Sequence, residues 1–505
     1  MILYVFKKDI SIKEINYNIY IKYIKKKIKG EGIKMRLYNT LANKIEDFKE
    51  IEKNKVKIYC CGPTVYDYPH IGNLRTFCVV DFLVRTFEYF NYEVLYVMNI
   101  TDVDDKIIKN ILKQKISLKE YTSKYERIFF ESIEKLNIRK ANYYPRATEH
   151  INEMVEIIKK LLEKGIAYIA EDGSIYYSIS KFKDYGKLSK IRIENLRAGA
   201  RVNVDEYDKE NLVDFALWKA YNENDGDVYW ETEIGKGRPG WHIECSAMNR
   251  KYLNQPFDIH AGGIDLIFPH HENEIAQSEG AFETPLANYW FHVNHLIVEG
   301  QKMSKSLGNI ITIKDIDNPL ALRLLYLQTH YRNKLNFTFE NYNGSKTALN
   351  SLLAFSNNIF DIMTYFHFQK NENISINSNI KQIVDNYIQD FELSLKDDLN
   401  TPKAISLLFE LMNSINVIIN KNPKQINYFD AEYIFNAIKK TDRVFGLKLT
   451  EFEEIPQEIK DLMFKRNEFR KNKQYEQADN IRNEILNRGY MVEDTAWGSR
   501  VRKKI

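Results

Sequence analysis

Short apolar runs alternate with amphipathic stretches in the first half of the chain. Residues 56–60 and 94–98 are apolar runs of strand length, and residues 71–89 between them repeat apolar side chains at helical spacing. A turn signal at residues 62–64 (Gly-Pro-Thr) separates the first run from the helix. This order of strand, loop, helix and strand predicts a βαβ unit of a parallel sheet, which binds ligands at the carboxyl ends of its strands.

The pattern changes twice further along the chain. Residues 147–228 combine a helix, expected over 151–164, with short segments and turn signals, and an apolar run at 257–260 then returns to the strand type. Beyond about residue 319, long amphipathic helices with almost no glycine predict a helical bundle. Three of these helices are expected over residues 321–329, 346–364 and 401–419.

These patterns predict a Rossmann-type α/β parallel-sheet catalytic domain with an inserted connective segment, followed by a helical bundle and a small C-terminal domain. The expected boundaries are a basic extension over residues 1–34, the parallel-sheet domain over 35–300 with its insertion at about 147–228, a loop region over 301–330, the bundle over 331–454 and the C-terminal domain over 455–505.

Composition places the chain among large globular proteins. Hydrophobic residues make up 44% of its 505 residues, enough for several cores, and 21 Gly with 11 Pro exclude collagen-like and Pro-rich architectures. No apolar run reaches the ~18 residues of a membrane span, and four cysteines in a chain of this length make a poor disulfide framework. We therefore expect a cytoplasmic protein with free thiols and no membrane partner.

Positive charge is concentrated at the N-terminus. Residues 1–34 hold nine Lys against three acidic residues, a net charge of +6, so the remainder of the chain carries −2 of the total of +4. A nucleic-acid surface would therefore be a local patch. The extension has three interpretations: a basic RNA-binding arm, a transit peptide, or a segment without function that precedes a true start at Met35.

Side chains suited to a metal occur at three places. His270 and Glu274, spaced i, i+4, would share one face of a helix, and His271 with Glu274 at i, i+3 is the competing pair. Cys61 ends the first predicted strand, and Cys245 lies in a tract that leads back to the sheet. Two thiolates, one imidazole and one carboxylate suit Zn²⁺, although a single free cysteine is more often a small core residue.

Two loops are candidates for binding phosphate. Residues 70–73 (His-Ile-Gly-Asn) lie where the loop after the first strand becomes a helix, so Gly72 would let a nucleotide approach the positive end of that helix. Lys302 and Lys305 belong to residues 302–309 (Lys-Met-Ser-Lys-Ser-Leu-Gly-Asn) and are suited to neutralising the charge of a triphosphate. Each tract alone is a weak signal, but their order around a βαβ pattern is specific.

These two loops resemble the two signature motifs of class I aminoacyl-tRNA synthetases. Longer tracts resemble the cysteinyl-tRNA synthetase family, and the resemblance covers essentially residues 36–504. The tracts are residues 61–67 (Cys-Gly-Pro-Thr-Val-Tyr-Asp), 99–106 (Asn-Ile-Thr-Asp-Val-Asp-Asp-Lys), 198–202, 235–248, 270–277, 397–402 (Asp-Asp-Leu-Asn-Thr-Pro) and 493–495 (Glu-Asp-Thr). The resemblance implies an enzyme that forms cysteinyl-adenylate and pyrophosphate from L-cysteine and ATP, then transfers cysteine to the terminal adenosine of tRNA(Cys).

The resemblance also implies a role for individual residues. Four of them are the implied ligands of one zinc ion: Cys61, Cys245, His270 and Glu274. The implied ATP-binding residues, with Mg²⁺ bound to ATP, are Gly62, His70, Gly72, Asn73, Gly263, Asp265, Lys302 and Lys305, of which His70, Asn73, Lys302 and Lys305 stabilise the transition state. Gly62, Thr101 and Trp241 are the implied amino-acid pocket. Asn73 departs from the family, which often has His there, and an Asn side chain cannot carry charge.

For tRNA, the resemblance implies a monomer whose bundle follows the stems and whose C-terminal domain reads the anticodon. Trp497, Arg500 and Arg502 are expected beside the unpaired bases, and an ordinary basic tail is the plainer alternative. One rival is a ligase that joins cysteine to an amino sugar, which shares the catalytic tracts but lacks the portion beyond about residue 390. A second is a catalytically silent RNA-binding relative, which should have lost zinc ligands or loop lysines that are all present here.

Overall fold

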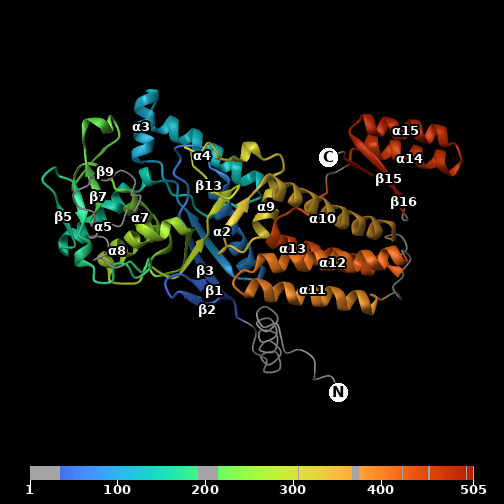
Figure 1. Ribbon diagram of the computed structural model, residues 1–505, viewed down its shortest axis with the longest axis horizontal. Helices are drawn as coiled ribbons and strands as arrows, with labels where there is room; N and C mark the ends of the chain where they lie inside the picture. The colour runs from blue at the N-terminus through green and yellow to red at the C-terminus, as the bar shows by residue number, and fades with distance from the viewer. Residues whose placement is uncertain are drawn as a thin grey trace, which may run out of the picture.

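The centre of the molecule is a four-stranded parallel sheet in the order β11-β10-β3-β4 (Figure 1). The computed structural model describes residues 34–191, 214–304, 306–366, 375–422, 425–452, 455–495 and 498–503. The strands are Lys55–Cys60 (β3), Glu93–Met98 (β4), Phe257–Gly263 (β10) and Ala287–Val293 (β11). The prediction of a Rossmann-type parallel sheet is therefore confirmed.

Helix α2 (Ile71–Tyr89) connects β3 to β4 and has the bounds that the apolar spacing predicts. Its apolar residues, among them Leu74, Phe77 and Phe82, are buried in the main core. The His70 side chain caps the helix by accepting a hydrogen bond from the backbone N–H of Asn73. Because the turn between β3 and α2 follows the last residue of β3, it lies at the carboxyl edge of the sheet.

The chain between β4 and β10 carries an inserted sheet, which lies at one end of the molecule (Figure 1). Before this sheet the chain forms α3 (Asp105–Gln114), α4 (Leu118–Lys135), which packs on α2, and α5 (Ile151–Glu163), and after it α7 (Trp241–Leu253). Between them is a sheet in the order β5-β6-β7-β9-β8. Its strands are Ala167–Ile169, Ile175–Tyr177, Phe215–Ala220, Trp230–Thr232 and Gly235–Pro239 for β5 to β9.

This inserted sheet continues beyond residue 228, where the insertion was expected to end. The pattern missed β9 because residues 235–239 contain two glycines and a proline, which are typical of a loop. Pairing with β7 nevertheless makes a strand of it, with Lys219 opposite Arg238. Residues 198–202, part of the resemblance, lie outside the described residues.

Two small sheets flank the central one. The hairpin of β1 (Arg36–Asn39) and β2 (Lys44–Asp47) lies next to β11. After β11 the chain forms a sheet in the order β13-β12-β14. These strands and the helix α9 between β13 and β14 are Leu296–Val298 (β12), Gln301–Lys302 (β13), Pro319–Leu327 (α9) and Leu335–Phe337 (β14).

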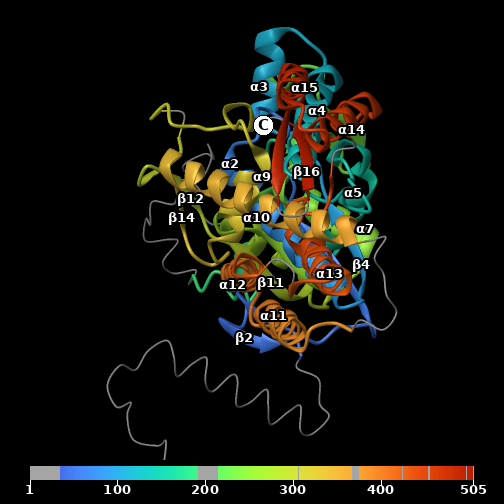
Figure 2. The same ribbon diagram turned by 90° about the vertical axis from the view of Figure 1, so that its right-hand side faces the viewer.

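The predicted bundle is present as four long helices (Figure 2). They are α10 (Phe339–Phe366), α11 (Ser378–Lys396), α12 (Thr401–Lys421) and α13 (Tyr428–Phe445). By length and composition α12 alone among the described helices could cross a membrane. Its residues Ile405, Leu408 and Ile415 are at most 3% exposed, so this helix supplies apolar side chains to the bundle core.

The C-terminal unit has a core of its own, formed by Ile459, Leu462, Met463, Ile485 and Val492. Its elements are α14 (Gln457–Lys471), α15 (Tyr475–Asn487), β15 (Tyr490–Thr495) and β16 (Gly498–Lys503). Figure 1 shows it beyond the bundle, at the end opposite the inserted sheet.

Candidate active site

A cavity of about 720 Å³ opens at the carboxyl ends of β3 and β10. The predicted site residues that line it are Cys61, Gly62, His70, Asn73, Trp241, Gly263 and Asp265. Gly72 and Lys302 lie outside its lining, although Gly72 faces the second phosphate loop: a Cβ atom there would lie 2.9 Å from Cε of Met303. Lys305 lies outside the described residues.

Two thiols meet at one side of the cavity. Cys61 directly follows β3, Cys245 lies in the second turn of α7, and their Sγ atoms are 3.8 Å apart. His270 and Glu274 complete a group whose four donor atoms all lie within 4.8 Å of one another, and all four residues are buried. The structure thus brings together the four residues that the sequence singles out as metal ligands.

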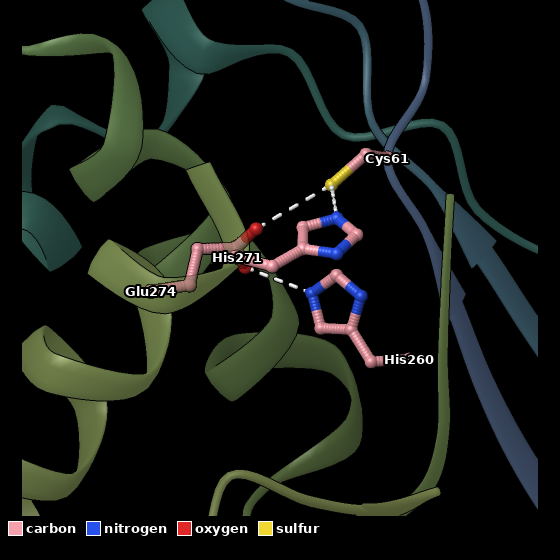
Figure 3. Close-up of side chains that lie close together, drawn as sticks. All are labelled: Cys61, His260, His271 and Glu274. Atoms are coloured by element: carbon pink, nitrogen blue, oxygen red, sulfur yellow. Dashed lines mark hydrogen bonds and ion pairs between the residues drawn. The ribbon is translucent and has the colours of Figure 1, made fainter. Parts of the chain in front are cut away.

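The two carboxylate oxygens of Glu274, on α8 (Glu272–Phe282), face different neighbours. Oε1 lies 3.2 Å from Nε2 of His270 and 3.4 Å from Sγ of Cys61. Oε2 lies 2.9 Å from Nε2 of His260 on β10 (Figure 3) and accepts a hydrogen bond of 3.2 Å from Asn249. The second oxygen is therefore held by the protein, and this orients the first oxygen toward the thiols.

A second group of possible ligands shares two residues with the first: Cys61, His260, His271 and Glu274 also lie with donor atoms within 4.8 Å of one another (Figure 3). Nε2 of His271 is 3.3 Å from Sγ of Cys61, and its Nδ1 is 2.8 Å from Nε2 of His292. This second group offers one sulfur, whereas the first offers two. Sulfur-rich donor sets favour zinc, so the first group is the better zinc site.

Two neighbouring side chains, His242 and Trp241, hold the ring of His270 in place. Nδ1 of His242 lies 2.9 Å from Nδ1 of His270, and the Trp241 ring packs at 4.2 Å from the His270 ring. Burial lowers the pKa of His242 well below its ordinary value, so this ring is neutral at pH 7. These contacts leave Nε2 of His270 facing the Glu274 carboxylate and the thiols.

The ionisable side chains of this group shift one another's pKa values. Burial opposes ionisation of the Cys245 thiol, but its hydrogen bond with Cys61 and the His270 imidazole lower its pKa to about 6. Burial raises the pKa of Cys61 well above its ordinary value, and its thiol donates to Cys245. Despite burial, Cys245 and Glu274 raise the pKa of His270 to about 10. Without a metal ion, these shifts favour a thiolate at Cys245 beside an imidazolium at His270, while Cys61 stays a thiol.

On the opposite wall, the His70 ring has a defined orientation. Burial lowers its pKa, so the ring is neutral at pH 7, and its Nδ1 accepts the 3.2 Å hydrogen bond from the Asn73 backbone. The ring proton therefore resides on Nε2, which leaves that N–H as the donor available to a phosphate oxygen. Asn73 itself is exposed on the cavity wall.

Thr101 is not among the residues that line the cavity, and its place in the amino-acid pocket stays a prediction. The residue is 2% exposed, and its hydroxyl accepts a 3.1 Å hydrogen bond from Asn99. The same Asn99 side chain accepts a 2.8 Å hydrogen bond from the backbone N–H of Gly62. Thr101 and Asn99 thus support the chain segment that carries Cys61 and Gly62.

At the far end of the molecule, the arginines expected to meet RNA bases bond within the protein. Arg500 forms ion pairs with Glu493 and with Asp361 of α10, and Arg502 lies 3.6 Å from Glu493. Arg500 therefore joins the C-terminal unit to the bundle. Trp497 lies outside the described residues. The contact of these residues with an anticodon stays a prediction.

Sequence reasoning missed three histidines that orient the first group or its neighbours: His242, His260 and His292. Each lies in a buried helix or strand, where a single histidine looks like an ordinary core residue. The number of histidines is the feature that could have revealed them, because five of the ten histidines in the chain lie at this site.

Comparison with known proteins identifies related families over most of the chain. Residues 47–347 match the family described as the tRNA synthetases class I (C) catalytic domain, and residues 390–450 match the DALR domain. The cysteine–tRNA ligase of Protochlamydia amoebophila (strain UWE25) is 43% identical over 483 residues, which cover 94% of this chain and 99% of the relative. That of Chlamydia felis (strain Fe/C-56) is 45% identical over 473 residues, covering 92% and 97%.

A solved structure shares the fold. Mycobacterium tuberculosis methionyl-tRNA synthetase in complex with methionyl-adenylate superposes with a TM-score of 0.56 at 13% identity, over 78% of this chain and 90% of that one. At this identity the likeness concerns architecture only. It agrees with a parallel sheet followed by helices.

Proposed function

The chain belongs to the cysteine–tRNA ligase family of class I tRNA synthetases, and from this premise we propose that Cys61, Cys245, His270 and Glu274 hold a zinc ion that selects cysteine by its thiol. The enzyme aminoacylates tRNA(Cys) with cysteine, and as a class I synthetase it uses ATP. The single observation that carries the zinc proposal is the buried group of two thiols, one imidazole and one carboxylate.

The distances within this group fit the spacing of donor atoms that would hold one zinc ion. Two sulfur atoms bound at about 2.3 Å to one tetrahedral zinc lie about 3.8 Å apart, and the two Sγ atoms are 3.8 Å apart. Nitrogen and oxygen ligands at about 2.1 Å lie about 3.4 Å apart, and Nε2 of His270 is 3.2 Å from Oε1 of Glu274. No ligand atom has to move far to bind the ion.

Selection of cysteine over serine is the problem that this group solves. A pocket that relies on shape separates such near-isosteres by about 1–3 kcal/mol. When bound, zinc supplies a soft Lewis acid that favours a thiolate far more than a hydroxyl. The protein's part is to hold the donors rigidly: His260 and Asn249 fix Glu274, and His242 fixes His270.

Adenylate formation needs positioning and charge stabilisation rather than a general base, because the attacking carboxylate is already ionised at pH 7. His70 presents its Nε2–H from the N-cap position of α2, where the helix dipole also favours phosphate. We assign Asn73, Lys302 and Lys305 to the same phosphates, with Mg²⁺ bound to ATP. The remaining ATP contacts are assigned to Gly62, Gly72, Gly263 and Asp265, and the amino-acid pocket to Gly62, Thr101 and Trp241.

We propose further that the bundle and the C-terminal unit bind the stems and the anticodon of tRNA(Cys), that the enzyme is a monomer, and that it acts in the cytoplasm. The relatives are covered over 97% and 99% of their length, so the C-terminal portion is common to them and this chain. That coverage disfavours the amino-sugar ligase, which lacks this portion.

The test is zinc content together with cysteine and serine activation, measured by ATP–pyrophosphate exchange in the wild type and in Cys245→Ser. We expect one zinc per wild-type chain, and loss of zinc in Cys245→Ser with cysteine preference reduced to the ~10- to 200-fold that shape provides. Cys78→Ser, a buried thiol on α2 outside both donor groups, is the matched control and should retain zinc. A metal-free wild type with undiminished cysteine preference would refute the proposal.

A further inference from the structure

The guanidinium of Arg75, in the second turn of α2, lies fully buried between α2 and two other chain segments. One Nη atom donates to the backbone carbonyls of Asn294 and His295, at 2.7 and 2.8 Å. The other donates to the carbonyls of His330 and Asn333, at 3.3 and 2.8 Å. A single side chain thus connects the helix that His70 caps to two loops far away in sequence.

Both loops lead directly into the small sheet that carries Lys302. His295 immediately precedes β12, and Asn333 lies two residues before β14, its parallel neighbour. Strand β13 pairs with β12 so that Lys302 lies opposite Ile297. Arg75 therefore fixes the starting point of β12, which pairs with the Lys302 strand, and that of β14 on the other side of β12.

The segment after Lys302 returns to the same helix. The backbone N–H of Ile71 donates to the carbonyl of Ile311 at 2.9 Å, and His70 forms a β-bridge with Thr312. The hydroxyl of Tyr326, on α9, donates to the carbonyl of Ile71 at 2.7 Å. The second phosphate loop is thus held at its entrance by Arg75 and at its exit by the first turn of α2.

The chemistry of this contact requires arginine. Burial lowers the pKa of Arg75 to about 10, which leaves the side chain charged at pH 7. Among the described residues no carboxylate forms an ion pair with it, so carbonyl oxygens solvate the charge. A planar guanidinium reaches four carbonyls at fixed angles, whereas the compact ammonium of lysine has three donors on a flexible stem.

We propose that Arg75 is a positioning residue of adenylate formation, which sets the separation between His70 and the strand that carries Lys302. The proposal rests on the proposed use of these two residues at the ATP phosphates. Arg75 does not line the cavity, so it acts only through the elements it joins. Because a misplacement of about 1 Å can cost ~100-fold in rate, loss of this contact should affect ATP use and spare cysteine binding.

The experiment is ATP–pyrophosphate exchange by full-length Arg75→Lys, with kcat and both KM values determined. We expect kcat to fall about 30- to 100-fold and the KM for ATP to rise several-fold, with the KM for cysteine within about twofold of wild type. Zinc content should match the wild type, since Cys61 and Cys245 lie on other elements. Unchanged kcat and ATP KM, or an equal rise in both KM values, would overturn the proposal.

Arg323→Lys is the matched control. Arg323 is likewise fully buried and donates to the carbonyls of Leu136, Asn137 and Phe445. It joins α9 to the bundle and pairs with Asp81 in the middle of α2, whereas Arg75 joins the beginning of α2 to the loops before β12 and β14. Arg323→Lys should lower thermal stability without changing the ratio of the KM for ATP to the KM for cysteine. A rise in the KM for ATP alone, as expected for Arg75→Lys, would count against a specific role for Arg75.

Tyr326→Phe is a second test if Arg75→Lys does not fold. It removes only one hydroxyl and its hydrogen bond to the carbonyl of Ile71 at the start of α2. We expect a smaller rise in the KM for ATP, again without a change for cysteine, and the absence of any rise would overturn the proposal. A wild-type enzyme without cysteine-dependent exchange would instead disprove the proposed function, so the two failures are distinct.

Discussion

Nε2 of His271 lies 3.3 Å from Sγ of Cys61, so a histidine outside the predicted ligand set touches a thiol within it. The two donor groups share Cys61 and Glu274 and differ in whether His270 with Cys245 or His271 with His260 completes them. Of the adjacent histidines, His270 contacts Oε1 of Glu274, whereas His271 contacts Sγ of Cys61. Which of them binds the ion is therefore an experimental question with a clear expected answer.

His270→Ala should lose zinc, whereas His271→Ala should retain it. His270 belongs to the group with two sulfurs, and His271 is the neighbour that supports Cys61 through its contact with His292. Loss of such a supporting residue weakens metal affinity by about 10- to 100-fold without abolishing binding. Metal analysis of the purified, dialysed proteins decides between them, and retention of zinc by His270→Ala with loss in His271→Ala would assign the ion to the second group.

Gly62→Ala should disrupt the site by displacing the backbone next to Cys61. A Cβ atom on residue 62 would lie 1.8 Å from the carbonyl oxygen of Asn99, so the backbone next to Cys61 would have to shift. We expect lower zinc content and at least ~100-fold slower ATP–pyrophosphate exchange. The control is Gly344→Ala in α10, where the Cβ atom would meet nothing within 4 Å and should stabilise the helix by ~1 kcal/mol. ATP–pyrophosphate exchange at the wild-type rate by Gly62→Ala would show that the contact between Gly62 and Asn99 tolerates a side chain.

The stability of the bundle should depend on pH through Asp442. Burial raises the pKa of this carboxyl from its ordinary 3.8 to about 6, although it accepts hydrogen bonds from the backbone of Leu447 and Leu449. A raised pKa means that the folded state favours the protonated form. Its contribution to stability is fully present below pH 3.8 and is lost as pH rises through about 6.

Asp442→Asn removes this titration. Relative to wild type, the unfolding free energy of the variant should therefore rise by about 1 kcal/mol between pH 5 and pH 7. Thermal unfolding of both proteins at the two pH values measures the difference, which cancels the titration of all other groups. A constant difference between the proteins would mean that Asp442 does not titrate in this range.

Local pattern predicted much of this fold. The apolar spacing places α2 at its observed bounds, because burying one face of a helix against a sheet requires that spacing. The i, i+4 relation of His270 and Glu274 predicts two donors on one face, and their atoms lie 3.2 Å apart. Where local and tertiary preferences disagreed, as in the glycine-rich strand β9, the pattern misled.

Pattern and motifs along the chain predict an inventory: the parallel sheet, two candidate phosphate loops, and the thiol, imidazole and carboxylate donors. The tertiary structure alone decided how those groups are oriented. His260 holds one oxygen of Glu274, Asn99 supports Gly62, and Arg75 fixes the sheet of Lys302. Such contacts depend on angles between elements distant along the chain, as with the 219 residues that separate Arg75 from Asn294. Periodicity records only whether a side chain is buried and not which atom it meets there.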